Sequence, residues 1–297
     1  MKILLSIVTF VCLILQEVIA MKVVLVTGGN RGIGLAICRR ILEEASDTKV
    51  LLGSRDMQRG KNAVAHLIEE LGASCDGRIE ALEIDTSSDD SVTKAATEVA
   101  SKHDSIYGIV NNAGVINTPC INTNYFGPRR VNDAFSDLLQ TPKGRIVNIA
   151  SASGPNHVSR LQDRNLAAQL SQPWLIEGGL EELDQMAVAL TETSDDYGTS
   201  KALLNAYTSI HARSQPNLII NSVTPGFIAS DMGKALGATK PTSDGAIPPV
   251  NLLLSEEFET IPTGRYYGSD TKRSPLHVYR GPGDPVYEGP DWATVEK

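Results

Sequence analysis

The sequence of 297 residues contains few cysteines, few histidines and no cluster of basic residues. Its four cysteines, Cys12, Cys38, Cys75 and Cys120, form no CxxC pair, so their spacing predicts neither a disulfide framework nor a zinc site. The five histidines stand singly, without the HExxH or HxH spacing of metal ligands. Acidic residues outnumber basic ones by 35 to 27, whereas nucleic-acid binding needs Lys and Arg gathered on one face. We therefore expect no metal site and no nucleic-acid partner.

The first 20 residues differ in composition from the rest of the chain. After Lys2 comes an apolar run at 3–15, and the small-residue pattern Val18-Ile19-Ala20 precedes a second methionine, Met21. This pattern is typical of a signal peptide or signal-anchor at residues 1–20, and the run is shorter than the about 20 apolar residues of a membrane span. The alternative is an upstream start codon joined in error to a protein that begins at Met21. The first interpretation places the protein in the secretory pathway or ER, the second in the cytoplasm.

Strand-like and helix-like segments alternate from Met21 onward. The run Val23-Val24-Leu25-Val26 is typical of a parallel strand that is buried on both faces. Similar runs predict further strands at 50–52, 79–84, 106–110, 145–149, 218–223 and 264–267. Helical spacing predicts helices at 35–45, 60–71, 91–102, 131–139, 200–212 and 245–254. The alternation predicts an α/β fold, a single doubly wound Rossmann-type domain over 21–297 with about seven parallel strands and helices on both faces. The Pro- and Gly-rich tail at 270–297 is expected to hold little regular structure.

The loop after the first predicted strand is rich in glycine. It reads Thr27-Gly28-Gly29-Asn30-Arg31-Gly32-Ile33-Gly34 and opens a predicted helix. Glycines at 28, 32 and 34 would let a pyrophosphate approach the backbone N–H groups at the helix N-terminus. A structural turn can also use such glycines, but the strand-loop-helix context favours dinucleotide binding.

The end of the second predicted strand indicates which dinucleotide is bound. An acidic residue there would accept hydrogen bonds from the ribose hydroxyls of NAD and repel a 2'-phosphate. This sequence has Gly53-Ser54-Arg55 instead. Because Arg55 and Arg31 offer two guanidinium groups to a phosphate, we predict that the cofactor is NADPH (NADP) rather than NAD.

A tyrosine and a lysine lie four residues apart in Tyr197-Gly198-Thr199-Ser200-Lys201, which places both on one face of a helix. That pair alone is weak evidence. Its context strengthens it, because Asn111-Asn112-Ala113-Gly114 ends the fourth predicted strand, Ser151 the fifth and Pro225-Gly226 the sixth. Ligands of such sheets bind at the carboxyl ends of the strands, so we expect these groups to meet at one edge.

Together these motifs resemble the short-chain dehydrogenase/reductase family over most of the chain, from Met21 to about Ser274. The resemblance lies in TGGNRGIG, NNAG, the turn at 124–127, Ser151, YGTSK and PGFIASDM. The long stretch between Ser151 and Tyr197 looks like the branch of monomeric carbonyl reductases and menthone reductases. The resemblance implies that NADPH reduces a carbonyl compound at this site.

The resemblance implies four catalytic residues. Tyr197 would be the general acid, and Lys201 would lower the pKa of its phenol and bind the nicotinamide ribose. Ser151 would hold the substrate oxygen, although Ser153 is an alternative nearby. Asn124 would anchor a water molecule that links Lys201 to solvent.

The resemblance also implies a set of residues that bind the dinucleotide. They are Gly28, Asn30, Arg31, Gly32, Ile33, Gly34, Arg55, Asp85, Thr86, Asn111, Ala113, Gly114, Tyr197, Lys201, Pro225, Gly226, Ile228 and Ser230. Asp85 and Thr86 would contact adenine, and Asn111 would line the adenosine side. Ile228 and Ser230 would hold the carboxamide and a phosphate.

Two segments depart from the usual pattern of the family. The path from Gly114 to Asn124 is short, which implies either a more open substrate pocket or an exon lost from the gene model. The insertion at 152–196 contains an apolar set, Trp174, Leu175, Ile176, Leu180, Leu183, Met186 and Leu190. This set would form a hydrophobic wall for a bulky substrate, or seal the surface where oligomeric relatives dock helices, or do both. The sealed surface would favour a monomer.

The motifs thus predict an oxidoreductase that transfers a hydride from NADPH to a ketone, aldehyde or quinone. The alternative is a non-catalytic protein on the same fold that binds NADP(H) as a sensor or interaction partner. The presence of both Tyr197 and Lys201 favours the enzyme.

Overall fold

Seven parallel strands form one sheet in the order β3-β2-β1-β4-β5-β6-β7. The structure is a computed structural model that describes residues 21–116, 119–191, 195–260 and 262–295, so the predicted leader lies outside the described residues. The strands are β1 (Lys22–Val26), β2 (Thr48–Ser54), β3 (Ile79–Glu83), β4 (Gly108–Asn111), β5 (Arg145–Ile149), β6 (Ile219–Val223) and β7 (Tyr266–Tyr267). The predicted doubly wound α/β fold is confirmed.

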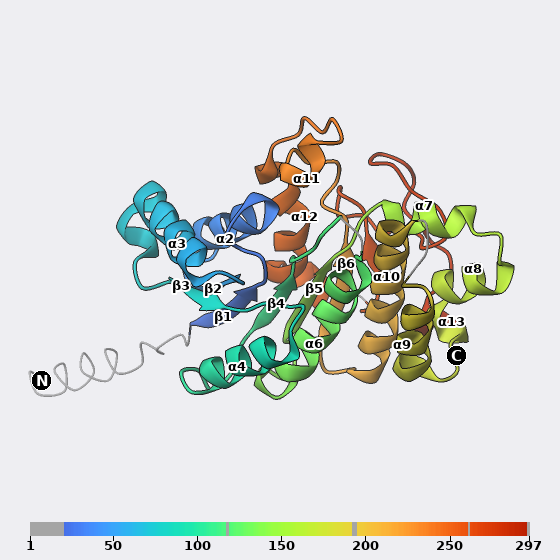
Figure 1. Ribbon diagram of the computed structural model, residues 1–297, viewed down its shortest axis with the longest axis horizontal. Coiled ribbons are helices and arrows are strands. Elements are labelled where there is room, and N and C mark those ends of the chain that lie inside the picture. The colour runs from blue at the N-terminus through green and yellow to red at the C-terminus, as the bar shows by residue number, and fades with distance from the viewer. Residues whose placement is uncertain (1–20, 117–118, 192–194, 261, 296–297) are drawn as a thin grey trace, which may run out of the picture.

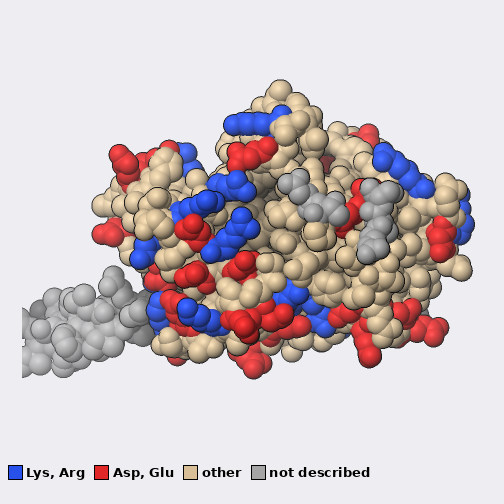
Figure 2. All heavy atoms as spheres, in the orientation of Figure 1, with Lys and Arg blue, Asp and Glu red and all other residues tan. Residues whose placement is uncertain are grey.

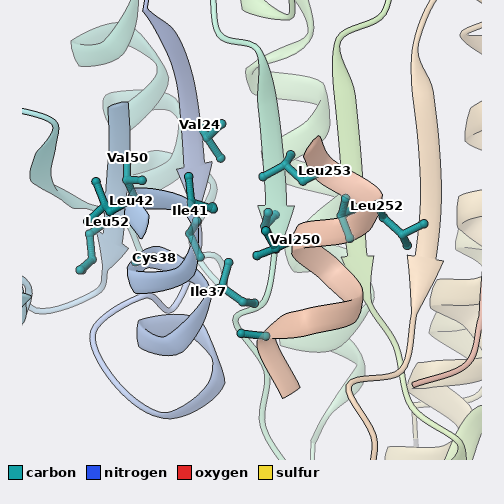
Figure 3. Close-up of a cluster of buried hydrophobic side chains, with 14 of the residues drawn as sticks. Val24, Ile37, Cys38, Ile41, Leu42, Val50, Leu52, Val250, Leu252 and Leu253 are labelled. Atoms are coloured by element: carbon teal, nitrogen blue, oxygen red, sulfur yellow. The ribbon is translucent and has the colours of Figure 1, made fainter. Parts of the chain in front are cut away.

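Helices cover both faces of this sheet (Figure 1). One face carries α2 (Gly32–Glu44), α3 (Met57–Leu71) and α12 (Thr242–Leu254), and the other carries α4 (Asp89–Ala100), α6 (Phe126–Ala134) and α10 (Asp196–Ser214). Side chains alternate along a strand, so Val24 (Figure 3) and Val26 of β1 pack toward α2, while Val23 and Leu25 pack toward α4. Because both faces are covered, the four residues that follow Lys22 in this strand are all apolar and buried.

The insertion folds into short helices that pack on α10. They are α7 (Ser153–Arg160), α8 (Arg164–Ser171), the 3-10 turn η3 (Pro173–Leu175) and α9 (Gly179–Ala189). Leu183 and Ile176 are buried against Leu203 and Tyr207 of α10, whereas Leu175 is 46% exposed. Most of the apolar set therefore seals the protein's own surface. The monomer stays a prediction.

A polar contact fixes α9 to the α6 side of the molecule. The Tyr125 hydroxyl donates to the Asp184 carboxylate at 2.5 Å, and the Arg129 guanidinium lies 3.4 Å from the same carboxylate. Tyr125 immediately precedes α6, and Asp184 lies in the middle of α9. The insertion is thus bound by charge as well as by apolar burial.

The remaining elements are short. They are the 3-10 turns η1 (Gly72–Cys75), η2 (Ser136–Leu138) and η4 (Glu256–Glu259), and the helices α5 (Ile121–Asn124), α11 (Asp231–Lys234) and α13 (Trp292–Val295). The tail packs back on the body, because Asp291 pairs with Arg265 at 2.7 Å and Trp292 donates to the Thr263 carbonyl at 2.8 Å. Within the described ranges, we find no helix with the length and apolar character that crossing a bilayer requires.

Candidate active site

A cleft of about 280 Å³ opens at the carboxyl ends of the strands. Figure 2 shows it as a hollow with Lys and Arg side chains along its margin. It brings together most of the predicted cofactor-binding residues. Those that line it are Gly28, Asn30, Arg31, Gly32, Ile33, Gly34, Arg55, Asp85, Thr86, Ala113, Gly114, Tyr197, Lys201, Pro225 and Ser230.

Three of the predicted cofactor-binding residues do not line the cleft. Asn111 is 2% exposed, and its amide donates to the side-chain oxygens of Asn132 and Asn148 beneath the sheet. As the last residue of β4 it points to the α6 side, while its neighbour Asn112 points into the cleft. Gly226 does not line the cleft, and Ile228 is buried under α12 at only 4% exposure.

The glycine loop is held in place by Asn112, a residue that the sequence reasoning missed. The Asn112 amide donates to the carbonyl oxygens of Thr27 at 2.9 Å and Gly28 at 3.2 Å. At Gly34 a Cβ atom would lie 2.2 Å from the Gly28 oxygen, so this position must be glycine. Gly32 has φ +57 and nothing but Ser230 beside it, which leaves its backbone open to the cleft.

Arginines gather at the end of the cleft near β2. Arg55 follows the strand, and Arg59, on the first turn of α3, lines the cleft beside it. Burial would raise the pKa of Asp85, but hydrogen bonds from Ser87 and the charge of Arg55 outweigh it and hold the pKa below its ordinary value. Arg31 pairs with Asp231 at 2.9 Å, and both side chains are more than two-thirds exposed. This end of the cleft therefore offers guanidinium groups to an anion.

The other end of the cleft contains the Tyr197 phenol. Asp195 caps α10 by accepting the Gly198 N–H at 2.9 Å, which places Tyr197 on the first turn of the helix. The Ser151 side chain is close enough to the phenol to lower its pKa, and its hydroxyl oxygen accepts the N–H of Ser153 at 3.1 Å. Of the two candidate serines, Ser151 is thus the one that influences the Tyr197 phenol.

The pKa of Tyr197 differs from the expectation that Lys201 would lower it. Burial raises the pKa of the phenol above its ordinary value, and the Ser151 side chain opposes this only in part. Lys201 lies 5.9 Å from the centre of the Tyr197 ring, and its ammonium donates to the Ile149 carbonyl at 2.8 Å. Burial also lowers the pKa of Lys201 to about 8. Because burial disfavours the ammonium form of Lys201, this lysine lowers the pKa of the phenol less than the spacing of the two residues predicted.

Asn124 lies near Lys201 but is occupied by other partners. Its amide oxygen accepts the Val115 N–H at 2.8 Å, and its amide nitrogen donates to the Val115 carbonyl at 2.8 Å and the Ser200 hydroxyl at 3.0 Å. A Cβ on Gly114 would lie 3.2 Å from the Asn124 oxygen and 3.7 Å from the Lys201 nitrogen. Asn124 therefore fixes the loop after β4, and its role in a water relay stays a prediction.

No group of three or more His, Cys, Asp or Glu side chains within the described ranges could hold a metal ion. The cleft residues suit a dinucleotide better. The glycine backbone is open to a pyrophosphate, the arginines offer charge at one end, and Tyr197 and Lys201 lie at the other. These observations fit NADP(H).

Comparison with known proteins decides the family. The sequence model described as short chain dehydrogenase matches residues 22–162. A (+)-neomenthol dehydrogenase of Arabidopsis thaliana is 30% identical over 290 residues, covering 82% of this chain and 94% of the relative. The chain belongs to the short-chain dehydrogenase family. It is therefore an oxidoreductase.

Two further similarities lie within the same branch of the short-chain dehydrogenases. Carbonyl reductase (NADPH) 1 of Homo sapiens is 30% identical over 275 residues, covering 82% of this chain and 95% of the relative. The solved menthone neomenthol reductase from Mentha piperita is 26% identical with a TM-score of 0.70, over 84% of this chain and 99% of that one.

Proposed function

We propose that the protein is an NADPH-dependent reductase of carbonyl compounds, acting on a ketone, aldehyde or quinone. The observation that carries the proposal is the placement of Tyr197 and Lys201, one helical turn apart, in the same cleft as the glycine loop, with the Ser151 side chain close enough to the phenol to lower its pKa. Relatives named as carbonyl reductases with NADPH and as menthone reductases support it.

NADP(H) is the cofactor, and it supplies the hydride when bound. The glycine loop between Gly28 and Gly34 would hold the pyrophosphate, and Arg55 and Arg59 would bind the 2'-phosphate. Lys201 would bind the nicotinamide ribose at the opposite end. Held in this way, the nicotinamide would lie at the end of the cleft that contains Tyr197.

Tyr197 would act as the general acid. Its raised pKa keeps the phenol protonated at neutral pH, so a proton is available for the carbonyl oxygen. The Ser151 hydroxyl would donate to the same oxygen and stabilise the negative charge that develops there. Lys201, when charged, would stabilise the phenolate that remains after the proton has left.

A substrate screen tests the proposal. The protein is mixed with quinones, ketones and aldehydes in turn, and the loss of the reduced nicotinamide absorbance is followed with NADPH and with NADH. We expect turnover with at least one class and a preference for NADPH. Tight NADPH binding without turnover of any class would favour the non-catalytic binding protein instead.

The lowered pKa of Lys201 predicts an alkaline limit to the rate. Below pH 8 the ammonium is charged, and above it the neutral amine no longer stabilises a phenolate. With saturating NADPH, we expect kcat/KM for the carbonyl compound to stay level at neutral pH and fall as the pH rises through about 8. A profile that stays level up to about pH 10, the ordinary range of a lysine or tyrosine, would contradict this role.

A further inference from the structure

The turn that carries Tyr197 is joined to the short helix α5 by two buried side-chain contacts. The Asp196 carboxylate accepts the backbone N–H of Cys120 in a short hydrogen bond, and the Asn124 amide donates to the Ser200 hydroxyl at 3.0 Å. The two residues of each pair are 76 positions apart, so one turn of α5 runs beside the first turn of α10.

Asp196 makes the contact at the start of α5. It is only 4% exposed, and Cys120, at 0% exposure, presents both its N–H and its thiol to the carboxylate. Burial, and then the negative charge of Asp196, raise the pKa of the Cys120 thiol to about 12, so the thiol remains protonated. The second carboxylate oxygen of Asp196 has no hydrogen-bond partner in the described part of the chain.

A buried carboxylate with one unpaired oxygen costs free energy, and an apolar side chain of similar volume would serve stability as well or better. Such violations of packing rules are concentrated at functional sites. Here the residue with the unpaired carboxylate oxygen, Asp196, directly precedes Tyr197 in the sequence. The carboxylate therefore needs an explanation beyond stability.

We propose that Asp196 is a positioning residue for catalysis. By holding Cys120 against the first turn of α10, it fixes the Tyr197 phenol relative to Ser151. Through the same helix α5, it also fixes Asn124 beside Lys201. The kinetic part of this inference rests on the proposed function.

The preceding residue, Asp195, holds the same turn from the opposite side. Its carboxylate lies 3.0 Å from the His157 ring of α7, and the other nitrogen of that ring lies 3.3 Å from the Thr199 hydroxyl. Asp195 is nearly half exposed, so its contact with His157 is screened by water and contributes little. The Asp196 contact, in contrast, is buried, because Asp196 is only 4% exposed.

Three variants test the inference. Asp196→Ala removes the contact, whereas Asp196→Asn keeps an oxygen that can accept the Cys120 N–H. Glu259→Ala is the matched control, because Glu259 is a carboxylate that pairs with the buried Arg145 at 3.2 Å. Arg145 is the first residue of β5, so this pair lies at the end of the strands away from the cleft. We expect Asp196→Ala to lower kcat by roughly 10- to 100-fold, the loss expected of a reacting group displaced by up to about 1 Å. The Kd of NADPH should change less than about twofold, and Asp196→Asn should recover most of kcat.

A second measurement does not depend on turnover. Alkylation of Cys120 by iodoacetamide, followed by peptide mapping, reports how firmly α5 is held. We expect Asp196→Ala to accelerate alkylation at Cys120 but not at Cys38 or Cys75, which are buried in the core on the α2 side. If Asp196→Ala does not fold, Asp196→Ser, whose oxygen is one bond too short, takes its place.

The outcomes separate the two proposals. If Asp196→Ala lowers Tm as Glu259→Ala does and leaves kcat unchanged, the positioning role is overturned. Unchanged alkylation at Cys120 would overturn the contact itself. If the wild-type protein turns over no carbonyl compound, the proposed function fails, while the alkylation still decides whether Asp196 holds α5.

Discussion

Replacing Tyr197 by Phe is expected to lower the rate of NADPH oxidation with a carbonyl substrate by roughly 10²- to 10⁴-fold, the usual contribution of a general acid. The change removes one oxygen and leaves the aromatic ring that packs in the cleft. The Kd of NADPH, measured by fluorescence titration, should therefore stay within about twofold of the wild-type value. Loss of kcat without loss of binding would place Tyr197 in the chemical step.

Tyr207→Phe is the matched control for this experiment. Tyr207 is on the same helix and fully buried, and its hydroxyl accepts a hydrogen bond from Asn132 at 3.0 Å. Removing that hydroxyl should cost stability, about 1 kcal/mol for a lost hydrogen bond, without changing kcat. If Tyr197→Phe keeps wild-type turnover, the phenol is not the proton donor, and the mechanism proposed for the site is wrong.

The sequence predicted the strands of this fold well because strands that are buried on both faces contain short apolar runs, such as 23–26 in β1 and 50–52 in β2. Helix beginnings were predicted less well. The predicted helix at 200–212 begins at Asp196 in the structure, and the one at 91–102 begins at Asp89. First turns are polar and capped, so they contain few of the apolar residues that define the helical period.

Most of the predicted cofactor-binding residues line the cleft, and the different placement of the others has physical causes. Asn111 was placed in the cleft because it belongs to a motif, but alternation along β4 directs it to the α6 side and Asn112 to the cleft. The pKa of Tyr197 depends on burial, which spacing alone does not give. Asp196 and Cys120 are 76 positions apart, and no local sequence pattern predicts the contact between them.

Replacing Arg55 by Ala is expected to weaken NADPH binding by about 10- to 100-fold, since a hydrogen bond to a charged group contributes about 1.5–3 kcal/mol. NADH lacks the 2'-phosphate, so its Kd should change little. The ratio of the two Kd values therefore reports the contact directly. Adding Arg59→Ala, in the first turn of α3 and also lining the cleft, should weaken NADPH binding further.

Lys61→Ala separates this contact from a general effect of charge. Lys61 is an exposed residue of α3 that does not line the cleft. Its replacement removes one positive charge, as the replacement of Arg55 does. We expect its NADPH and NADH affinities to match those of the wild type. Equal weakening of both cofactors by Arg55→Ala would show that Arg55 contacts a part they share. Selective weakening of NADPH would place the 2'-phosphate at the β2 end of the cleft, with the nicotinamide at Tyr197.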